Sequence, residues 1–357
     1  MLKGNKGEWS EIYTLLRLLG DKGIHIGDKN LNKIPDLLYP IIKILRDETN
    51  ESFEYSIRDK IKIIKDNEIL FEIEVEEFKK MADLLLTEIK NNDKTFEVPQ
   101  IEGFLSLIKC NTLKAKSSAK TDIKIVIHDL KTNSQPELGF SIKSQLGNPS
   151  TLLNAGKTTN FIYKTDILLS DSEIEKINLI CSKEKIKDRI NALKKLDIGI
   201  YYFDLSNNVF KNNLVLIDSL MPEILGEVVK CFYSTKFSNL SDLSDELTNN
   251  NPLNFDLKHN HQFYEYKLKR FLTDVAVGMM PSKVWNGVYD ATGGYLVVKE
   301  SGEVLAYHLY NRNEFENYLF FNTKLETAST NRHGFGKLYM KDNESFINLN
   351  LQIRFLK

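Results

Sequence analysis

The sequence predicts a mixed protein of the α/β (α+β) class, with helices packed around a central β-hairpin. Residues 121–127 and 139–145 alternate apolar and polar side chains with the period of two that strands require. Residues 8–19 and 76–91 instead repeat their apolar side chains with helical spacing. The chain has 357 residues, of which 42% are hydrophobic and 27% charged, so it is long enough to bury a sizeable core.

The two hairpin strands carry the residues with the clearest chemical potential. If the strands pair across the turn-rich loop 131–136, the carboxylate of Asp122 comes close to the ammonium of Lys143. An Asp at a strand start, followed by an acid-x-Lys triplet on the next strand, is typical of metal-dependent nucleases. Their chemistry needs carboxylate oxygens for a divalent cation and a positive group near the scissile phosphate. Here the triplet begins with Ser141, and the simpler interpretation is an ordinary hairpin with one solvated charged face.

Segments on both sides of the hairpin are suited to contacts with phosphate groups. Residues 145–161 are rich in Ser, Thr, Asn and Lys, whose small polar or cationic side chains match phosphate oxygens. The candidates there are Ser150, Thr151, Asn154, Lys157 and Asn160. Upstream, residues 114–120 form a basic loop that leads into Asp122, with Lys114, Lys116 and Lys120 as candidates. A solvated loop is the structural alternative for this second segment.

The net charge of the chain neither indicates nor excludes binding to nucleic acid. The net charge is −1, from 48 Lys and Arg against 49 Asp and Glu, so any DNA-binding face requires the cations to gather in one cleft. The cysteines Cys110, Cys181 and Cys231 are widely spaced, which predicts free thiols in a reducing compartment. No signal peptide or membrane-spanning run is evident, so we expect a cytoplasmic protein.

The remaining elements follow from the same periodicities. Short strands are predicted at residues 24–27, 39–45, 53–57, 61–64 and 69–75. A long amphipathic helix is predicted over residues 170–196, with strands at 198–205, 214–217 and 284–287 and a terminal strand over 347–355. The clearest linker is the polar stretch at residues 249–252. We therefore expect an N-terminal region (1–95), a core with the hairpin (96–248) and a β-rich C-terminal region (249–357).

One short polar segment in the C-terminal region has the residue types that read bases. The segment begins at Ser329. Arg332 and His333 are residue types that bond guanine edges, and Asn331 is a type that bonds an adenine or a phosphate. A surface loop that uses Asn and Gly for its turns is the alternative.

Several blocks of sequence resemble the HpaII family of type II restriction endonucleases. The blocks occupy residues 4–11, 139–147, 151–154, 159–161, 318–324, 329–333 and 349–355, so the resemblance runs through the whole chain. It implies Mg²⁺-dependent cleavage of double-stranded DNA within CCGG by a PD-(D/E)xK-type core, a mixed sheet flanked by helices. It also implies Asp122 as the metal-binding acid and Lys143 as the catalytic lysine. A homodimer matching a palindromic site, and a cognate DNA methyltransferase in the same host, are further expectations.

The resemblance leaves one carboxylate to be found, because Ser141 stands where the triplet acid belongs. Residues 144–164 contain no Asp or Glu, so the second metal ligand must come from elsewhere. We rank Glu11 first, Glu8 second and Glu137 third. For Glu8 and Glu11 the alternative is acids in a first helical turn, which the helix dipole favours. Gln145 is a candidate for supplying a neutral oxygen or orienting the water.

Two other functions fit parts of the sequence. A sequence-specific DNA-binding protein that has lost catalysis would explain Ser141, and Mg²⁺-dependent nicking of a plasmid would distinguish it from an enzyme. An enzyme acting on small phosphorylated substrates has less support, because the chain has neither a GxxxxGK[ST] loop nor a dinucleotide fingerprint.

Overall fold

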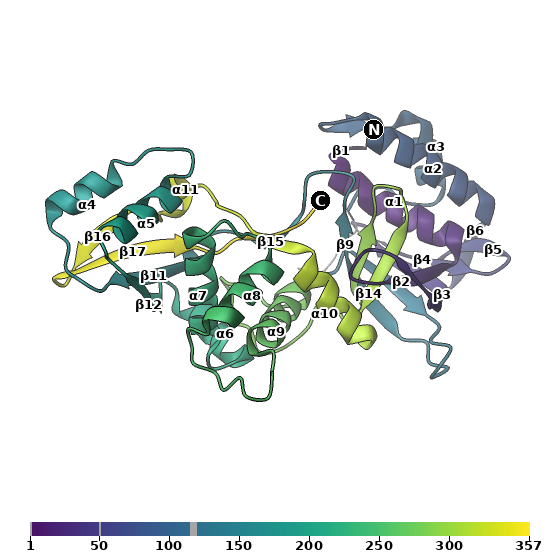
Figure 1. Ribbon diagram of the computed structural model, residues 1–357. Helices are drawn as coiled ribbons and strands as arrows, with labels where there is room; N and C mark the ends of the chain where they lie inside the picture. The colour runs from purple at the N-terminus through teal and green to yellow at the C-terminus, as the bar shows by residue number, and fades with distance from the viewer. Residues whose placement is uncertain (1, 50, 115–119) are drawn as a thin grey trace.

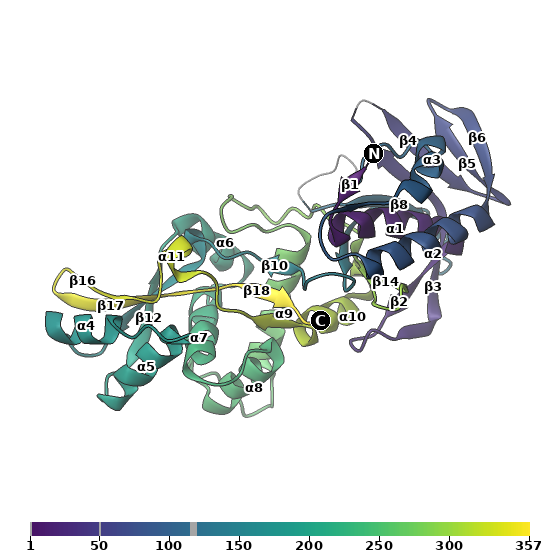
Figure 2. The same cartoon turned by 90° about the horizontal axis from the view of Figure 1, so that it is seen from above.

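The chain folds into two lobes, and the hairpin lies in the first of them (Figure 1). The structure is a computed structural model that describes residues 2–49, 51–114 and 120–357. Each lobe has its own cluster of buried apolar side chains. Seen from above, the short strands β10 (Thr151–Leu153) and β18 (Ile353–Phe355) lie in the second lobe, close to α9 (Figure 2). The mixed α and β class is confirmed.

A nine-stranded sheet organises the first lobe, in the order β2-β14-β13-β9-β8-β3-β4-β5-β6. Pairing of β2 with β3 closes the strands from β2 to β3 into a ring. The strands of this sheet are β2 (Gly23–Gly27), β3 (Lys33–Asp47), β4 (Ser52–Ile57), β5 (Lys60–Lys65), β6 (Glu68–Glu74), β8 (Ile123–Ile127), β9 (Glu137–Ser144), β13 (Gly294–Val298) and β14 (Val304–His308). Two further short strands, β1 (Lys3–Gly4) and β7 (Phe96–Glu97), pair with each other in a separate sheet. The helices are α1 (Lys6–Asp21), α2 (Val75–Asn91) and α3 (Pro99–Leu107). The sheet thus takes strands from all three expected regions of the chain.

Helices dominate the second lobe, around two smaller sheets of order β12-β11-β17-β16 and β10-β18-β15. The helices are α4 (Asp171–Asn178), α5 (Lys185–Lys195), α6 (Asn208–Ile217), α7 (Met221–Ser234), α8 (Leu240–Asn250), α9 (Phe263–Val277), α10 (Arg312–Phe321) and α11 (Thr330–His333). Its remaining strands are β11 (Asn160–Thr165), β12 (Ile200–Leu205), β15 (Thr323–Leu325), β16 (Leu338–Lys341) and β17 (Glu344–Asn350). Single 3₁₀ turns occur at Lys157–Thr159 and Leu309–Asn311.

The predicted hairpin is confirmed, with β8 and β9 antiparallel and Ile123 opposite Phe140. The pairing continues one residue beyond β8, because the amide of Asp122 donates to the carbonyl of Phe140 at 2.8 Å. On its other side β9 pairs in parallel with β13, which brings Tyr295 opposite Ser141. The hairpin is therefore at the centre of the sheet, where its register is fixed from both sides.

Four sequence-based expectations about local structure are wrong. The helix expected over 170–196 is two helices, because the guanidinium of Arg189 bonds the carbonyls of Asn178 and Ile180 and ends α4 there. Residues 214–217 belong to α6, whose start is capped by the side chain of Asn207. Residues 284–287 form no strand, and Val284 is exposed. The expected terminal strand is also interrupted, so that β17 and β18 join different sheets.

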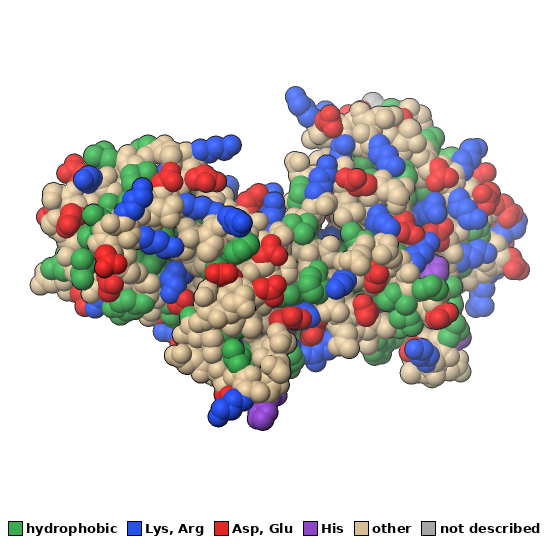
Figure 3. Space-filling model, viewed as in Figure 1, with side chains coloured by type: hydrophobic (Ala, Val, Ile, Leu, Met, Phe, Trp, Pro, Cys, Tyr) green, Lys and Arg blue, Asp and Glu red, His purple; other side chains and the backbone are tan. Residues whose placement is uncertain are grey.

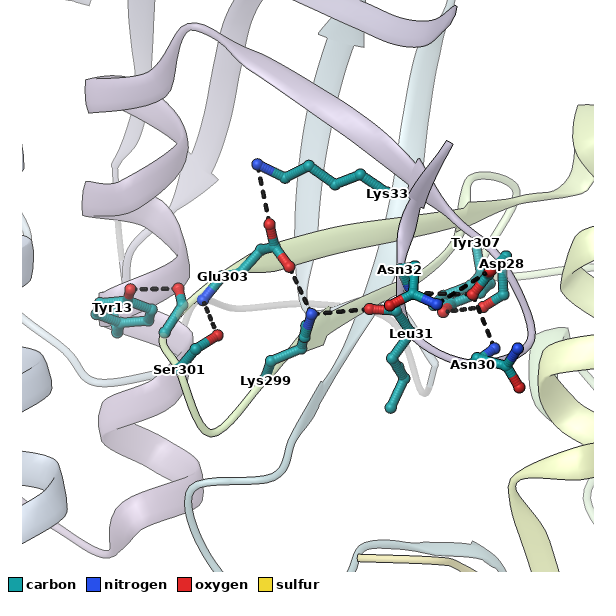
Figure 4. A network of polar contacts seen from close by, with 11 residues as sticks. Tyr13, Asp28, Asn30, Leu31, Asn32, Lys33, Lys299, Ser301, Glu303 and Tyr307 are labelled. Carbon is teal, nitrogen blue, oxygen red and sulfur yellow. Dashed lines mark hydrogen bonds and ion pairs between the residues drawn. The ribbon is translucent and has the colours of Figure 1, made fainter. Parts of the chain in front are cut away.

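A polar network fastens the turn between β13 and β14 to neighbouring segments (Figure 4). Glu303 bonds the ammonium groups of Lys33 and Lys299, at 2.9 and 2.6 Å, and Lys299 also donates to the carbonyl of Leu31. The hydroxyl of Tyr13 on α1 donates to the carbonyl of Gly302. Gly302 has φ +96°, and a Cβ there would meet Leu86 at 2.4 Å, so this turn requires glycine.

The structure also agrees with the expected state of the cysteines. Cys110, Cys181 and Cys231 are all free thiols. No helix in the described parts of the chain is long and apolar enough to cross a membrane.

A buried histidine packs against strand β9. The imidazole of His308, at the end of β14, is 2% exposed and packs against Phe140 and Tyr39. Its Nδ1 accepts a hydrogen bond from the amide of Tyr310, while no described group bonds its Nε2. Burial lowers the pKa of His308 from 6.5 to about 4, partly opposed by Asp129. The folded protein therefore holds this side chain neutral.

We predict that His308 makes the protein less stable in mild acid. The unfolded chain takes up a proton below pH 6.5, whereas the folded chain does so only near pH 4. The stabilisation is therefore complete above pH 6.5 and declines between these two values, by about 2 kcal/mol at pH 5. Denaturant unfolding of the protein and of His308→Gln at pH 7.5 and pH 5 measures it. Equal losses in the two proteins would contradict the prediction.

Candidate active site

A polar cavity of about 710 Å³ opens beside the start of α1, near the C-terminus of the chain. Its lining joins α1, β9 and the segment after β9, and includes Asn5, Glu8, Glu11, Lys114, Asp122, Lys143, Ser144, Ser150 and Lys357. In the space-filling view the surface is hollowed between the two lobes on this side of the molecule (Figure 3). The hairpin residues and the first-ranked acid thus share one cavity.

The carboxylate, the serine and the lysine of the hairpin form a chain of hydrogen bonds. Asp122 Oδ2 accepts from the Ser141 hydroxyl at 3.0 Å and from the Ile142 amide at 2.7 Å. Lys143 Nζ donates to Ser141 Oγ at 2.8 Å. The expected approach of Asp122 and Lys143 is therefore mediated by Ser141, which is buried between them. No described residue donates a hydrogen bond to Asp122 Oδ1, so that oxygen is available to a ligand.

An aromatic ring holds the lysine from the other side. Lys143 Nζ is 4.7 Å from the centre of the Tyr295 ring, a cation–π distance. The hydroxyl of Tyr295 bonds the carbonyl of Ala276 at 3.3 Å, which fixes the ring. Burial lowers the pKa of Lys143, while the negative charges of Asp122 and Glu11 act in the opposite direction. Sequence reasoning missed Tyr295, because the parallel pairing of β13 with β9 has no local sequence signal.

Glu11 reaches the site from α1. The helix is fastened to β9 by a hydrogen bond of 2.8 Å between the hydroxyls of Ser10 and Ser144. Burial, and after it the neighbouring charge of Asp122, raise the pKa of Glu11 to about 7. Glu11 and Asp122 line the same cavity, so the two carboxyl groups face one volume.

The other two candidate acids are placed differently. Glu8 lines the cavity, but it also completes the capping box of α1, because its carboxylate accepts from the amide of Asn5 at 2.9 Å. It lies 3.7 Å from the ammonium of Lys114. Glu137 is exposed at the opposite end of β9 and does not line the cavity. This geometry favours Glu11 over both.

Gln145 lies just past the end of β9, where its backbone amide donates to the carbonyl of Val298 at 2.8 Å. Its side chain lines a smaller cavity, of about 20 Å³, that also borders Lys143 and Ser150. Gln145 is thus near the lysine but outside the lining of the larger cavity that holds the carboxylates.

The candidate phosphate contacts after the hairpin divide into accessible and buried residues. Ser150 lines the active-site cavity, and Thr151 pairs with Arg354 in the three-stranded sheet of the second lobe. Asn154 and Lys157 are exposed. Asn160 is buried, and its side-chain amide donates to the carbonyl of His333 at 2.9 Å. Its contact therefore positions the polar segment at 329–333.

The basic loop before Asp122 is only partly described. Lys114 lines the cavity, whereas Lys116 lies outside the described residues. Lys120 donates to the carbonyl of Val275 at 3.0 Å. Burial and the nearby charge of Lys143 lower the pKa of Lys120 to about 8. The Lys120 amine therefore lies near Lys143.

The segment expected to read bases, residues 329–333, lies on the second lobe. Its last four residues form α11, and Ser329 directly precedes the helix. Ser329, Asn331 and Arg332 are exposed, and His333 is partly buried. In Figure 1, α11 lies on the upper side of its lobe, the side on which α1 begins in the first lobe. The segment and the cavity are thus on the same side of the molecule, with the hollow of Figure 3 between the lobes.

Comparison with known proteins identifies the family of the chain. A family model described as HpaII restriction endonuclease matches residues 5–355. The chain is 48% identical to the type II restriction enzyme HpaII of Haemophilus parainfluenzae, over 99% of this chain and 98% of that protein. No solved structure matches the chain. A match of this extent to both settles the resemblance: the chain belongs to the HpaII restriction endonuclease family.

Proposed function

We propose that this restriction endonuclease hydrolyses both strands of DNA at a short palindromic site, CCGG, in a reaction that requires Mg²⁺. The observation that carries the proposal is the meeting of Asp122, Glu11 and Lys143 at one open cavity. The arrangement fits a nuclease of the PD-(D/E)xK type in which an acid from a helix takes the place of the triplet acid. The specificity is suggested by the relative, which is named as the enzyme HpaII.

The residues present fit a magnesium ion. Asp122 and Glu11 offer carboxylate oxygens to the same volume, and their mutual repulsion would be relieved by a cation between them. Among the described residues no three His, Cys, Asp or Glu side chains cluster as metal ligands. Two carboxylates suffice, because Mg²⁺ usually keeps several waters and takes one or two protein carboxylates. When bound, the ion would polarise the phosphate and lower the pKa of a bound water.

The chain's own residues supply positioning and charge. Lys143 is held between Ser141 Oγ and the Tyr295 ring, so its ammonium points to a fixed place beside the carboxylates. A cation held there stabilises the charge that develops on the phosphoryl group in the transition state. Ser141 accepts from Lys143 and donates to Asp122, which keeps both groups in one geometry. It thereby does the positioning that an acid in the triplet would do.

The experiment that tests the function is digestion of a plasmid of known sequence with and without Mg²⁺. Fragments with ends at every CCGG, formed only with the metal, are the expected result. Ends at another sequence would overturn the specificity. An absence of cleavage would support the inactive DNA-binding alternative instead.

We predict that Lys143→Ala binds DNA nearly normally but cleaves at least about 100-fold more slowly, because it loses stabilisation of the transition state. Lys124→Ala is a matched control, since Lys124 lies on the neighbouring strand β8 and faces Asp47. Cleavage rates under single turnover and binding without metal measure the two effects. A cleavage rate of Lys143→Ala close to that of the control would remove Lys143 from its role.

We predict that Glu11→Gln raises the Mg²⁺ concentration needed for half-maximal cleavage by about tenfold or more, because the shape is kept and one ligand charge is lost. Glu137→Gln is the control, since Glu137 is exposed at the far end of β9. Titration of cleavage rate against Mg²⁺ makes the measurement. An unchanged titration for Glu11→Gln would show that the second carboxylate comes from another residue.

We also propose that the enzyme acts on its site as a homodimer, because a two-fold axis in the protein matches a palindrome. A cognate DNA methyltransferase that protects the host site belongs to the same proposal. Sedimentation of the complex with a duplex bearing one site should give two chains per duplex. One chain per duplex would instead indicate successive nicking by a monomer.

A further inference from the structure

A second cavity, of about 470 Å³, lies beside the segment expected to read bases. One wall comes from the corner between α4 and α5 and contains Lys183, Glu184, Lys185 and Lys187. The other wall contains the exposed Ser329 and Asn331 at the start of α11. The corner exists only because the expected long helix is broken at this point.

The charge around this cavity is positive. Three lysines face one glutamate, and neither Lys183 nor Lys185 forms an ion pair with any residue in the described part of the chain. Lys187 is fixed, because its ammonium donates to the carbonyl of Thr235 at 3.0 Å and lies 5.2 Å from the Phe232 ring centre. The opposite wall adds a hydroxyl and an amide that can donate hydrogen bonds to an anion.

The buried side chain of Arg189 is bonded to the same corner between α4 and α5. The guanidinium of Arg189 is 3% exposed and bonds only carbonyls among the described residues, those of Asn178, Ile180 and Gly336. No described carboxylate neutralises it, so it adds to the positive potential of the corner. Its bond to Gly336 also ties the corner to the loop that follows α11. The two walls therefore form one rigid site.

We propose that this cavity binds a phosphate of the DNA backbone next to the bases contacted by residues 329–333. The inference rests on the proposed function and adds where the backbone is held. Lys183 and Lys185 neutralise the phosphate, and Ser329 and Asn331 bond its oxygens. A backbone contact at this place fixes the register of the duplex against α11 without reading sequence itself.

The test is the salt dependence of DNA binding, measured without Mg²⁺ on a 20-base-pair duplex that contains CCGG and on a scrambled duplex. We expect Lys183→Ala combined with Lys185→Ala to reduce the slope of log affinity against log salt by about 1, because the two lysines together neutralise one phosphate. The ratio of affinities for the two duplexes should stay unchanged, because a phosphate contact weakens binding to all sequences alike.

Lys194→Ala combined with Lys195→Ala is the matched control. It removes the same charge, but from the C-terminal end of α5, and Lys194 lies about 14 Å along the helix axis from Lys185. Circular dichroism of both double variants establishes that the lobe is folded. The control should keep the slope of the unmodified enzyme.

The outcomes separate this inference from the proposed function. A reduced slope in the first double variant alone supports the phosphate site. An unchanged slope, or equal reductions in the two variants, overturns the site while leaving the nuclease proposal intact, provided that the unmodified enzyme binds DNA and cleaves it. If the unmodified enzyme shows no salt-dependent binding, both proposals fall together.

Discussion

The pairing of β9 between β8 and β13 is the constraint on which the rest of the site depends. It sets Phe140 opposite Ile123 and Ser141 opposite Tyr295. Because side chains alternate along a strand, a slip by one residue would turn Ser141 and Lys143 to the opposite face. The β13 strand is buried on both faces, with Leu296 in the core of the first lobe and Tyr295 in the core of the second. The register that builds the site is thus held by the packing of both lobes.

The geometry around Ser141 explains how a triplet without its acid can still be ordered. A hydroxyl both accepts and donates, so Ser141 bonds Lys143 and Asp122 together at 2.8 and 3.0 Å. The hydroxyl lacks a negative charge, and in our proposal Glu11 supplies one from α1. The cost is visible in Glu11 itself, since burial and Asp122 raise its pKa to about 7. A cation between the two carboxylates would remove that cost.

In the second lobe, buried polar side chains hold the surface segments that face DNA in our proposal. The side-chain amide of Asn160 donates to the carbonyl of His333, and its Oδ1 accepts from the side chain of Asn350 at 2.7 Å. Arg189 joins the α4–α5 corner to Gly336. Buried groups of this kind fix a conformation because leaving any of them unpaired is costly. Asn160, which we first considered for DNA contact, therefore holds the surface segment at 329–333 in place from a buried position.

The sequence by itself determined the hairpin, α1 and α2, because strand and helix periodicity are local properties, and it determined the family through blocks spread along the chain. It also singled out Asp122, Lys143 and Glu11, because their residue types follow from the chemistry. Tertiary structure decided what periodicity cannot encode. The parallel neighbour of β9 comes from more than 150 residues later, which is how Tyr295 reaches Lys143. Arg189 ends α4 by a contact from the next helix, so the helix expected over 170–196 is broken. The position of Tyr295 and the end of α4 were thus determined by long-range strand pairing and buried hydrogen bonds, which depend on the whole fold.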